Sequence, residues 1–353
     1  LIAVHHVLSH QVGGFDNASV RIIRNARQSV IRWTPRGRWI HLRLQHGCRR
    51  RNGGVIAQEE RFLRRATPHK RVHDIGLSIH RRFAPNVKAI GGIQNATIIQ
   101  GADNVGMTQR IQTDIEPNRL ESFDEQRCRS IRVKCERHGV HLGLHTLSGV
   151  NIAEISPLLR DAADNYLRAY IDLSLRIGAE WIVVHGGYHF TNCRKIRMQA
   201  SIDRLKRAVE YAEKKKVLLL LENLNGEPEL AEVHYMPDNL EDTRHYFEQI
   251  QSTSLRWSFT INHAHFDPIG ISGFIEGMDM SLCEEVRVAD NNGEYEIHMR
   301  PGTGTVDFGD MIKRIEASGF KGHYMNGYGS LDDMLRGREH LLNCAREAGI
   351  TWA

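Results

Sequence analysis

Six polar residues each follow a short apolar run, and their types are those that move protons, bind metals or hold a substrate. They are His145, His185, Glu222, Asn262, Asp290 and Asn326. A carboxylate such as Glu222, placed directly after the apolar run 217–221, would be partly desolvated. Desolvation raises the pKa of a carboxyl group unless a cation or a hydrogen-bond donor holds it. Glu222 is therefore the first candidate for chemistry.

Each of these residues also has an ordinary structural explanation. A single His at the end of a strand is more often hydrogen-bonded within the fold than bound to a ligand, and Asn is a common turn former. Six polar ends in register favour a shared site. We nevertheless expect one or two of them to be structural.

The runs that precede these residues predict the strands of a parallel sheet. Nearly continuous apolar stretches suit strands that are buried on both faces. The six predicted strands cover residues 140–145, 181–185, 217–222, 257–262, 286–290 and 323–326. Their ends are 28 to 40 residues apart, the length of one strand and one helix. Amphipathic helices are predicted between strands at 125–137, 155–177 and 202–212, and after Ser330 or Asp332.

Two more strands, predicted at 110–115 and 75–83, complete the eight of an α/β fold of the (β/α)8 TIM barrel type over residues 72–353. An open doubly wound sheet is the alternative. No GxGxxG or GxxxxGK[ST] loop follows any predicted strand, so we expect no nucleotide cofactor. In a barrel the carboxyl ends of all strands meet at one face, where the six polar ends would converge together with His265.

Composition excludes several classes of protein. The chain has 353 residues, 41% hydrophobic and 25% charged, which excludes collagen, coiled coil and wholesale disorder. No apolar run is long enough to span a membrane, and residues 1–11 lack the order of a signal peptide. The six cysteines form no CxxC pair, so neither a disulfide framework nor a thiolate zinc site is indicated. We expect a cytoplasmic protein with no membrane partner.

The positive charge is concentrated at the N-terminus. Residues 1–70 contain 14 Lys and Arg against 3 Asp and Glu, whereas residues 71–353 are acidic overall. A nucleic-acid-binding arm is one interpretation. The composition instead favours an Arg-rich extension over residues 1–71 that is disordered or non-native. The acidic remainder argues against a nucleic acid partner.

Six segments at the strand ends resemble those of the xylose-isomerase-like TIM barrels. This superfamily includes sugar phosphate isomerases and epimerases and the apurinic-site endonucleases. The segments are HTLSGVNIA at 145–153, VVHGG at 183–187, LENL at 221–224, INHAHF at 261–266, VRVADNN at 286–292 and HMRPGTG at 298–304. The resemblance covers most of residues 72–353 and implies the barrel fold and an enzyme acting on a small sugar.

The resemblance also implies roles for individual residues. It places the family's metal-binding Glu on Glu222 and its D-x-x-H motif on Asn262 and His265. The metal-binding V-H-x-x-D pattern falls on Arg287 and Asp290, and the last-strand acid, usually the second acid/base group, falls on Asn326. Three of the four ligands of the usual Mn²⁺ or Mg²⁺ site are therefore changed.

Two arrangements remain chemically reasonable. Arg has no lone pair for a metal, and amide oxygens are weaker ligands than carboxylates. In the first arrangement His145, His185 and Glu222 form a His₂Glu set for a divalent metal, zinc or manganese, with one open position. In the second, the guanidinium of Arg287 lies where the metal would be and performs its electrostatic function. The second arrangement explains why three ligands are lost while a cation is gained.

Residues after the seventh predicted strand add a further candidate. The resemblance implies that His298 contacts the substrate or a metal, and Glu296 could join it. The turn 301–304 could offer backbone N–H groups to an anion, but the sequence favours a simple turn. Of the aromatic residues near strand ends, we treat Tyr328 as a pocket candidate.

The leading hypothesis is an isomerase or epimerase that moves a proton next to a carbonyl of a sugar or keto-acid substrate. Such a reaction needs a base and an electrophile for the enolate oxygen. Glu222 is the proposed base, His265 and His185 position or protonate the substrate, and Arg287 or a metal is the electrophile. Because Asn326 replaces the second acid, a lyase is a variant. The predicted substrate contacts are His145, His185, Asn262, Asp290 and His298.

Two other functions stay open. One is a metal-dependent phosphodiesterase of the apurinic-site endonuclease type, which needs several carboxylate and His ligands. The other is a non-catalytic sugar-binding barrel, because replacing acids by Asn keeps hydrogen bonding and removes acid/base capacity. The sequence leaves the substrate and the oligomeric state undetermined.

Overall fold

The computed structural model describes residues 19–24, 27–34, 38–44, 77–78, 96–98, 107–114, 118–190 and 193–350. The chain divides into two units, Leu1–His69 and Lys70–Ala353. The first unit contains three antiparallel strands that the sequence periodicity does not predict: β1 (Ser19–Arg24), β2 (Arg27–Thr34) and β3 (Arg38–Leu44). The assignment of residues 1–71 as a separate disordered or non-native extension stays a prediction.

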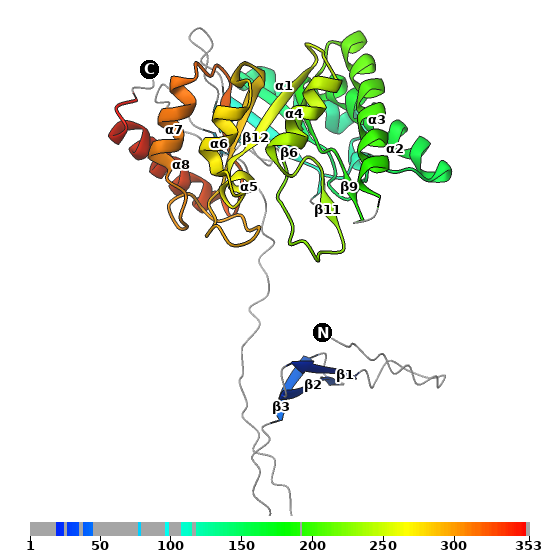
Figure 1. Cartoon of the computed structure of the whole chain (residues 1–353). Helices are drawn as coiled ribbons and strands as arrows, with labels where there is room; N and C mark the ends of the chain where they lie inside the picture. Colours follow the sequence, from blue (N-terminus) through cyan, green and yellow to red (C-terminus); the bar gives the residue numbers. More distant parts are fainter. Residues whose placement is uncertain are drawn as a thin grey trace, which may run out of the picture. The chain divides into compact units, whose positions relative to one another are not determined.

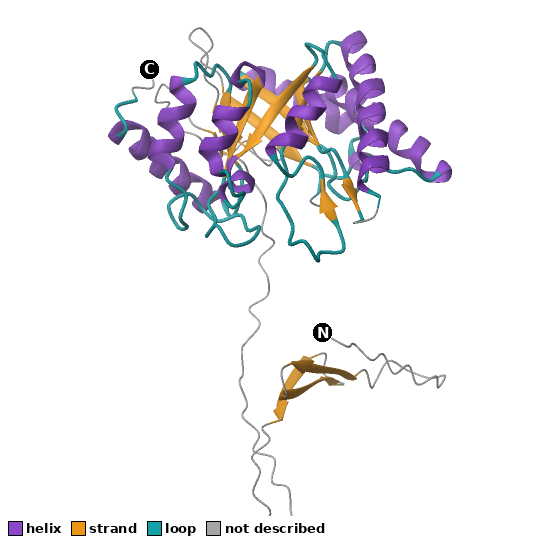
Figure 2. Ribbon diagram, viewed as in Figure 1, coloured by secondary structure: helices purple, strands orange, loops and turns teal. Residues whose placement is uncertain are grey.

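The second unit is a TIM barrel in which seven of the described strands run parallel (Figures 1 and 2). In ring order they are β6 (Met107–Gln112), β7 (Val140–His145), β8 (Ala179–Val184), β10 (Leu218–Glu222), β12 (Leu255–Thr260), β13 (Cys283–Val288) and β14 (His323–Asn326). The ring closes through the short strand β5 (Ala96–Ile98), which pairs antiparallel with both β14 and β6. The predicted barrel is confirmed.

The first strand of the barrel differs from the prediction. Of residues 75–83, the structure describes Leu77–Ser78 (β4), which pairs antiparallel with β14, and the rest of that segment lies outside the described residues. Strand β5 lies between β14 and β6 in the sheet, and only eight residues separate β5 from β6 in the sequence. Such a short connection suits an antiparallel pair, whereas a parallel pair needs a long crossover.

Helices cover the outside of the barrel (Figure 2). They are α1 (Glu125–His138), α2 (Pro157–Ile177), α3 (Arg194–Lys215), α4 (Leu240–Gln249), α6 (Gly270–Gly277), α7 (Phe308–Ala317) and α8 (Leu331–Glu347), with the short α5 (Ile261–His265) directly after β12. Gly178 ends α2 in the left-handed conformation. Ser330 caps α8 in a capping box with Asp333. Among the described residues no helix is both long and apolar enough to cross a membrane.

Smaller elements connect these helices and strands. Two short 3-10 helices, η1 (Leu120–Ser122) and η2 (Met280–Leu282), precede α1 and β13. Strands β9 (Tyr188–His189) and β11 (His234–Tyr235) form an antiparallel pair after β8 and β10. Figure 1 shows this pair below the barrel, on the side where α5 follows β12. That side is therefore the carboxyl-end face of the parallel strands.

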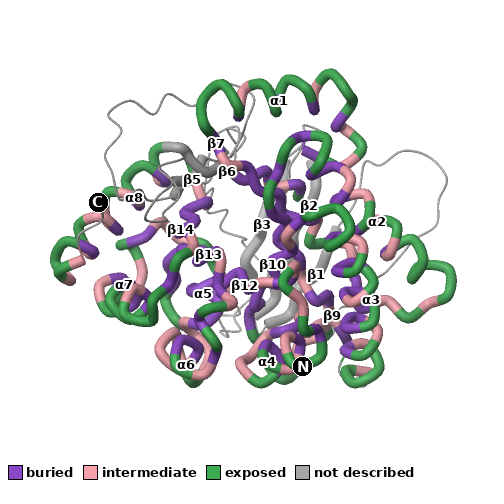
Figure 3. The backbone as a smooth tube through the Cα atoms, turned by 90° about the horizontal axis from the view of Figure 1, so that it is seen from above, coloured by how far each residue is buried: buried purple, intermediate pink, exposed green. Residues whose placement is uncertain are grey.

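Alternation along the strands separates an apolar layer from a polar interior. Leu219 and Leu221 of β10 pack in the core between sheet and helices, whereas Leu220 lies in the interior cluster with Trp181 and Met325. Figure 3 shows the buried strands at the centre and the exposed outer faces of the helices.

The interior beneath the carboxyl-end face contains a buried ion pair. Arg110 donates to Glu285 over 2.8 Å, and both side chains are buried. Trp181, Ser258 and His323 donate further hydrogen bonds to the same carboxylate. A buried charge is tolerated when it is paired and hydrogen-bonded in this way. This network forms the floor beneath the polar strand ends.

Candidate active site

Four predicted site residues point into the barrel at its carboxyl-end face. His145 and Glu222 are the last residues of β7 and β10, His185 directly follows β8, and Arg287 is the last but one of β13. Each is an even number of residues from an interior position of its own strand, so the alternation of side chains turns it inward. The fold thus brings together residues that are up to 142 positions apart in the sequence.

Glu222 is at the centre of this group. Its Oε1 accepts a hydrogen bond from the Thr260 hydroxyl over 2.7 Å. Its Oε2 lies 3.3 Å from His145 Nε2 and 3.2 Å from His185 Nε2, and forms an ion pair with Arg287 Nη1. Burial alone would raise the pKa of Glu222, but Arg287 and the two histidines outweigh it and hold that pKa well below its ordinary value. The carboxylate is therefore ionised at neutral pH.

His145 is neutral and presents a lone pair to the interior. Burial lowers its pKa to about 4, although the nearby Glu222 carboxylate opposes this shift. Its Nδ1 lies 2.7 Å from the Thr146 carbonyl oxygen, which makes Nδ1 the protonated nitrogen. Nε2 is then the acceptor, and Arg287 Nη1 lies 3.4 Å from it.

Arg287 connects the two sides of the site. Its guanidinium is 5% exposed, and Nη1 contacts Glu222 while Nη2 donates to the Tyr328 hydroxyl. Burial opposes its charge, but Glu222 dominates the balance and the pKa of Arg287 lies above its ordinary value. Arg287 is thus a fixed cation at the centre of the barrel mouth.

A second cluster adjoins the first. His263 Nε2 lies 3.1 Å from Glu296 Oε1, and His298 Nε2 lies 2.6 Å from the same oxygen. Burial would raise the pKa of Glu296, but the two histidines hold it below its ordinary value. His263 also lies 3.7 Å from Glu222, and the ring of Tyr328 stacks on that of His298 with centroids 4.0 Å apart. The two clusters therefore form one continuous polar site.

Asn262 borders the second cluster. It lies in α5 rather than at a strand end, and its Nδ2 is 3.3 Å from Glu296 Oε1. Three buried atoms around the site, Asn262 Oδ1, Glu296 Oε2 and Arg287 Nε, have no hydrogen-bond partner within the described part of the chain. Buried polar atoms are normally paired, so these three are available to a ligand.

Asp290 lies outside the two clusters and has a structural role. Its carboxylate accepts backbone N–H bonds from Asn291, Gly302, Thr303, Gly304 and Val306. The anion at the glycine-rich turn is therefore this side chain. A Cβ at Gly304 would lie 2.5 Å from Asp290 Oδ1, so the turn requires glycine there. The Asp290 backbone also pairs with Met299, which fixes the loop carrying Glu296 and His298.

Two residues predicted to be catalytic also lie away from Glu222. His265 is half-buried at the end of α5 and contacts the Thr305 hydroxyl at 2.9 Å. Asn326 points outward, because its neighbour Met325 fills the barrel interior, and its Nδ2 donates to the Met334 carbonyl in α8 over 2.9 Å. The positions of both side chains give no support to the roles that the resemblance implied.

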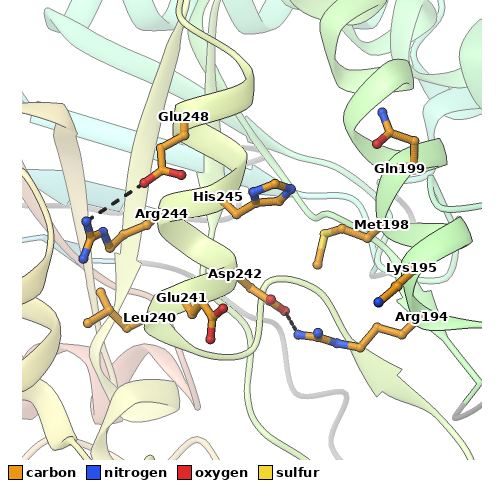
Figure 4. A pocket seen from close by; sticks show the side chains of 10 residues that line it. All are labelled: Arg194, Lys195, Met198, Gln199, Leu240, Glu241, Asp242, Arg244, His245 and Glu248. Carbon is orange, nitrogen blue, oxygen red and sulfur yellow. Dashed lines mark hydrogen bonds and ion pairs between the residues drawn. The ribbon is translucent and has the colours of Figure 1, made fainter.

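A groove of about 550 Å³ lies between the start of α3 and α4 and is separate from these clusters (Figure 4). Arg194 pairs with Asp242 across it, and Arg244 lies 4.0 Å from Glu248 on α4. Its lining contains none of the predicted site residues. Its lining contains three Lys or Arg residues and three Asp or Glu residues, so its formal charges balance.

The sequence of residues 101–344 matches the model of the xylose isomerase-like TIM barrel family. The chain belongs to this family. A relative, an uncharacterized protein of Methanocaldococcus jannaschii, is 23% identical over 212 residues, which cover 58% of this chain and 70% of that protein.

Solved structures of other barrels share the fold. A D-tagatose 3-epimerase-like protein superimposes with a TM-score of 0.62 at 20% identity, covering 70% of this chain and 90% of that chain. D-psicose 3-epimerase from Clostridium cellulolyticum H10 gives 0.55 at 13% identity, covering 69% and 89%. L-ribulose 3-epimerase gives 0.55 at 13% identity, covering 70% and 87%. At these identities the likeness establishes the fold alone.

The family's D-x-x-H spacing falls on different residues in the structure than in the sequence comparison. β12 ends at Thr260, whose side chain points inward to Glu222, and three residues later comes His263 of the second cluster. The sequence comparison instead placed the motif on Asn262 and His265. Strand alternation alone does not distinguish the two placements, because Thr260 and Asn262 lie two residues apart on the same face, and only the end of β12 at Thr260 decides between them. His263 and Thr260 are the site residues that sequence reasoning missed.

Among the residues that the structure describes, two groups could hold a metal: His145 with His185 and Glu222, and His263 with Glu296 and His298. In the first, the ligand atoms are 3.2 to 3.3 Å apart. The edges of a tetrahedron around zinc with bonds of about 2.0–2.1 Å are about 3.3 Å long, so type and spacing suit zinc. Arg287, however, already neutralises Glu222 and lies against the fourth corner. With that cation in place the first group does not fit a divalent ion.

Proposed function

We propose that this protein is a sugar epimerase-like enzyme that moves a proton next to a carbonyl, with Glu222 as the base and Arg287 as the electrophile. The observation that carries the proposal is the buried Glu222–Arg287 ion pair at the mouth of the barrel. It provides a carboxylate that can accept a proton and a cation that can hold an enolate oxygen. The epimerases with this fold support the reaction class.

Because of the ion pair, Glu222 becomes an effective base only when the substrate binds. In the free enzyme Arg287 keeps the pKa of Glu222 low, and a carboxylate of low pKa is a weak base. A carbonyl oxygen that binds the guanidinium draws its charge away from Glu222. The pKa of the carboxyl group then rises towards the value that burial favours. Proton abstraction is thereby linked to substrate binding.

The substrate we propose is a small ketose or a carboxylated or phosphorylated keto sugar. His185, which is 14% exposed, and the unpaired oxygens of Asn262 and Glu296 provide contacts for hydroxyl groups. Arg287 is a cation, and Glu296 raises the pKa of His263 although burial opposes this. Both side chains therefore favour an electron-rich or anionic group. The neutral His145 contacts the Arg287 guanidinium through Nε2 and helps to hold it in place.

The test is exchange of the substrate's carbon-bound proton in deuterated water, followed by NMR on D-tagatose, D-psicose and L-ribulose. The wild-type protein should exchange the proton next to the carbonyl of at least one ketose. Glu222→Gln should slow exchange by about 100-fold or more, because the amide cannot accept the proton. Glu180→Gln is the matched control, since Glu180 is exposed and contacts His141 outside the site. Full turnover by Glu222→Gln would rule out the proposed base.

A metal-dependent phosphodiesterase is a second candidate, favoured by the two adjoining groups of His and Glu ligands. It would need metal ions at both groups, and the charge of Arg287 opposes a metal ion at His145, His185 and Glu222. Hydrolysis of a duplex with an abasic site by zinc-treated protein, with no ketose exchange, would favour this function. Saturable sugar binding with neither reaction would instead indicate a non-catalytic barrel.

A further inference from the structure

We infer that Tyr328 is the second acid/base residue, which returns the proton to the substrate on the face opposite Glu222. This inference rests on the proposed function and adds the residue that an epimerase still needs there. Inversion at a carbon requires one group to remove a proton from one face and another to deliver a proton to the other. Glu222 alone would return the proton to the face from which it came.

The last strand offers no acid for this task. β14 contributes His323 and Met325 to the interior, where His323 contacts Glu285 beneath the site and Met325 is apolar. Asn326 faces α8. Tyr328, two residues beyond the strand, is the first side chain after Met325 that reaches the site, through its contact with Arg287.

The geometry sets Tyr328 across the guanidinium from Glu222. Nη1 of Arg287 contacts the Glu222 carboxylate, and Nη2 donates to the Tyr328 hydroxyl. An enolate oxygen held by Arg287 would therefore have the carboxylate near one amino group and the phenol near the other. The carbon attached to that enolate lies between a base and an acid.

Packing holds the phenol in this place. The rings of Tyr328 and His298 are nearly parallel, at 13° and 4.0 Å between centroids, and Glu296 holds His298 at 2.6 Å. Gly329, with φ of 84°, adopts the left-handed conformation that returns the chain towards α8. A Phe at position 328 would keep the ring stack and lose only the hydroxyl.

The proton balance closes without a co-reactant. Glu222 takes the proton from the carbon next to the carbonyl, and the C–H electron pair forms the enolate, whose oxygen Arg287 holds. Tyr328 then gives its O–H proton to the same carbon from the other face, and the carbonyl re-forms. Glu222 is left protonated and Tyr328 is left as a phenolate. Exchange with water moves one proton back after the product leaves.

Electrostatics favour this order of events. The ordinary pKa of a tyrosine phenol is about 10, well above neutral pH. The phenol is therefore protonated when the substrate binds. Once Glu222 has accepted the proton its negative charge disappears, and Arg287 stabilises the phenolate that forms. The phenol becomes a stronger acid at the step that needs it.

The experiment compares D-fructose with D-psicose, which differ only in the configuration at C3, in deuterated water with the wild type and Tyr328→Phe. With the variant, epimerisation should fall by about 100-fold or more in both directions. Exchange of the C3 proton should persist for the sugar whose proton faces Glu222 and stop for its epimer. Glu222→Gln should stop exchange of the C3 proton that faces position 222. Tyr211→Phe, which removes a hydroxyl bonded to Asp172 on the outer helices, is the matched control for loss of a partly buried tyrosine hydrogen bond.

Each other outcome would overturn the inference. If Tyr328 only positions Arg287, exchange will fall equally for both sugars in Tyr328→Phe. Unchanged epimerisation by this variant would remove Tyr328 from the reaction and leave the proposed function intact. If the wild-type protein exchanges the C3 proton of neither sugar, the protein does not epimerise D-fructose and D-psicose. That result would refute the proposed function for these two sugars and the role assigned to Tyr328.

Discussion

Replacing Arg287 tests whether its guanidinium takes the place of a metal. Arg287→Ala leaves the Glu222 carboxylate, 1% exposed, without its guanidinium partner. Removing one partner of a buried pair costs about 3–5 kcal/mol, because the other charge remains buried. The variant without metal should therefore unfold at a clearly lower urea concentration than the wild type.

Zinc should restore part of that stability in the variant alone. Without the guanidinium, His145, His185 and Glu222 keep their 3.2 to 3.3 Å spacing and have an open fourth position. A ligand at 100 times its dissociation constant stabilises a fold by about 2.7 kcal/mol. Urea unfolding with and without zinc, together with elemental analysis, measures both effects. Arg287→His, which adds an imidazole ligand, should bind zinc more tightly still.

The control is a second buried arginine far from the site. Arg204 is 2% exposed and pairs with Asp164 between α2 and α3. Arg204→Ala should lose stability without any response to zinc. A stoichiometric metal in the wild-type protein would refute the reasoning, because it would show that the cluster accepts an ion beside Arg287. No zinc response in either Arg287 variant would refute it as well.

Two further predictions concern stability outside the ion pair. Asp290→Asn removes part of the acceptor for five backbone N–H groups. We expect the free energy of unfolding, measured in urea, to fall by about 3 kcal/mol and amide exchange across 302–306 to become faster. Normal protection of these amides would contradict the structural role of Asp290. Burial and Asp242 raise the pKa of Asp238 to about 6 from 3.8, so the folded state binds the proton more tightly and stability falls as pH rises through that interval. Asp238→Asn should abolish this fall and be more stable than wild type by about 2 kcal/mol at pH 7; equal pH profiles in urea unfolding would show that the shift is absent.

The sequence by itself determined the barrel and the centre of its site. Apolar runs of strand length at regular intervals specify parallel strands buried on both faces, and the carboxyl ends of such strands meet at one face whatever the loops do. His145, His185 and Glu222 were predicted there because each ends a strand-length apolar run, and the family resemblance added Arg287. These local patterns need no knowledge of tertiary contacts.

Only the tertiary structure decided which of the remaining polar residues face the site. Asp290 and Asn326 also end predicted strands, but Asp290 lies three residues after Arg287 and Asn326 one residue after Met325. An odd offset turns a side chain to the other face. His263 enters the site because β12 ends at Thr260 and a helical turn follows, which strand spacing alone does not reveal. The pairing of Arg287 with Glu222 and Tyr328 depends on three strands meeting in space. The sequence specifies which residues of a strand alternate inward and outward, whereas packing against the whole barrel decides at which residue the strand ends.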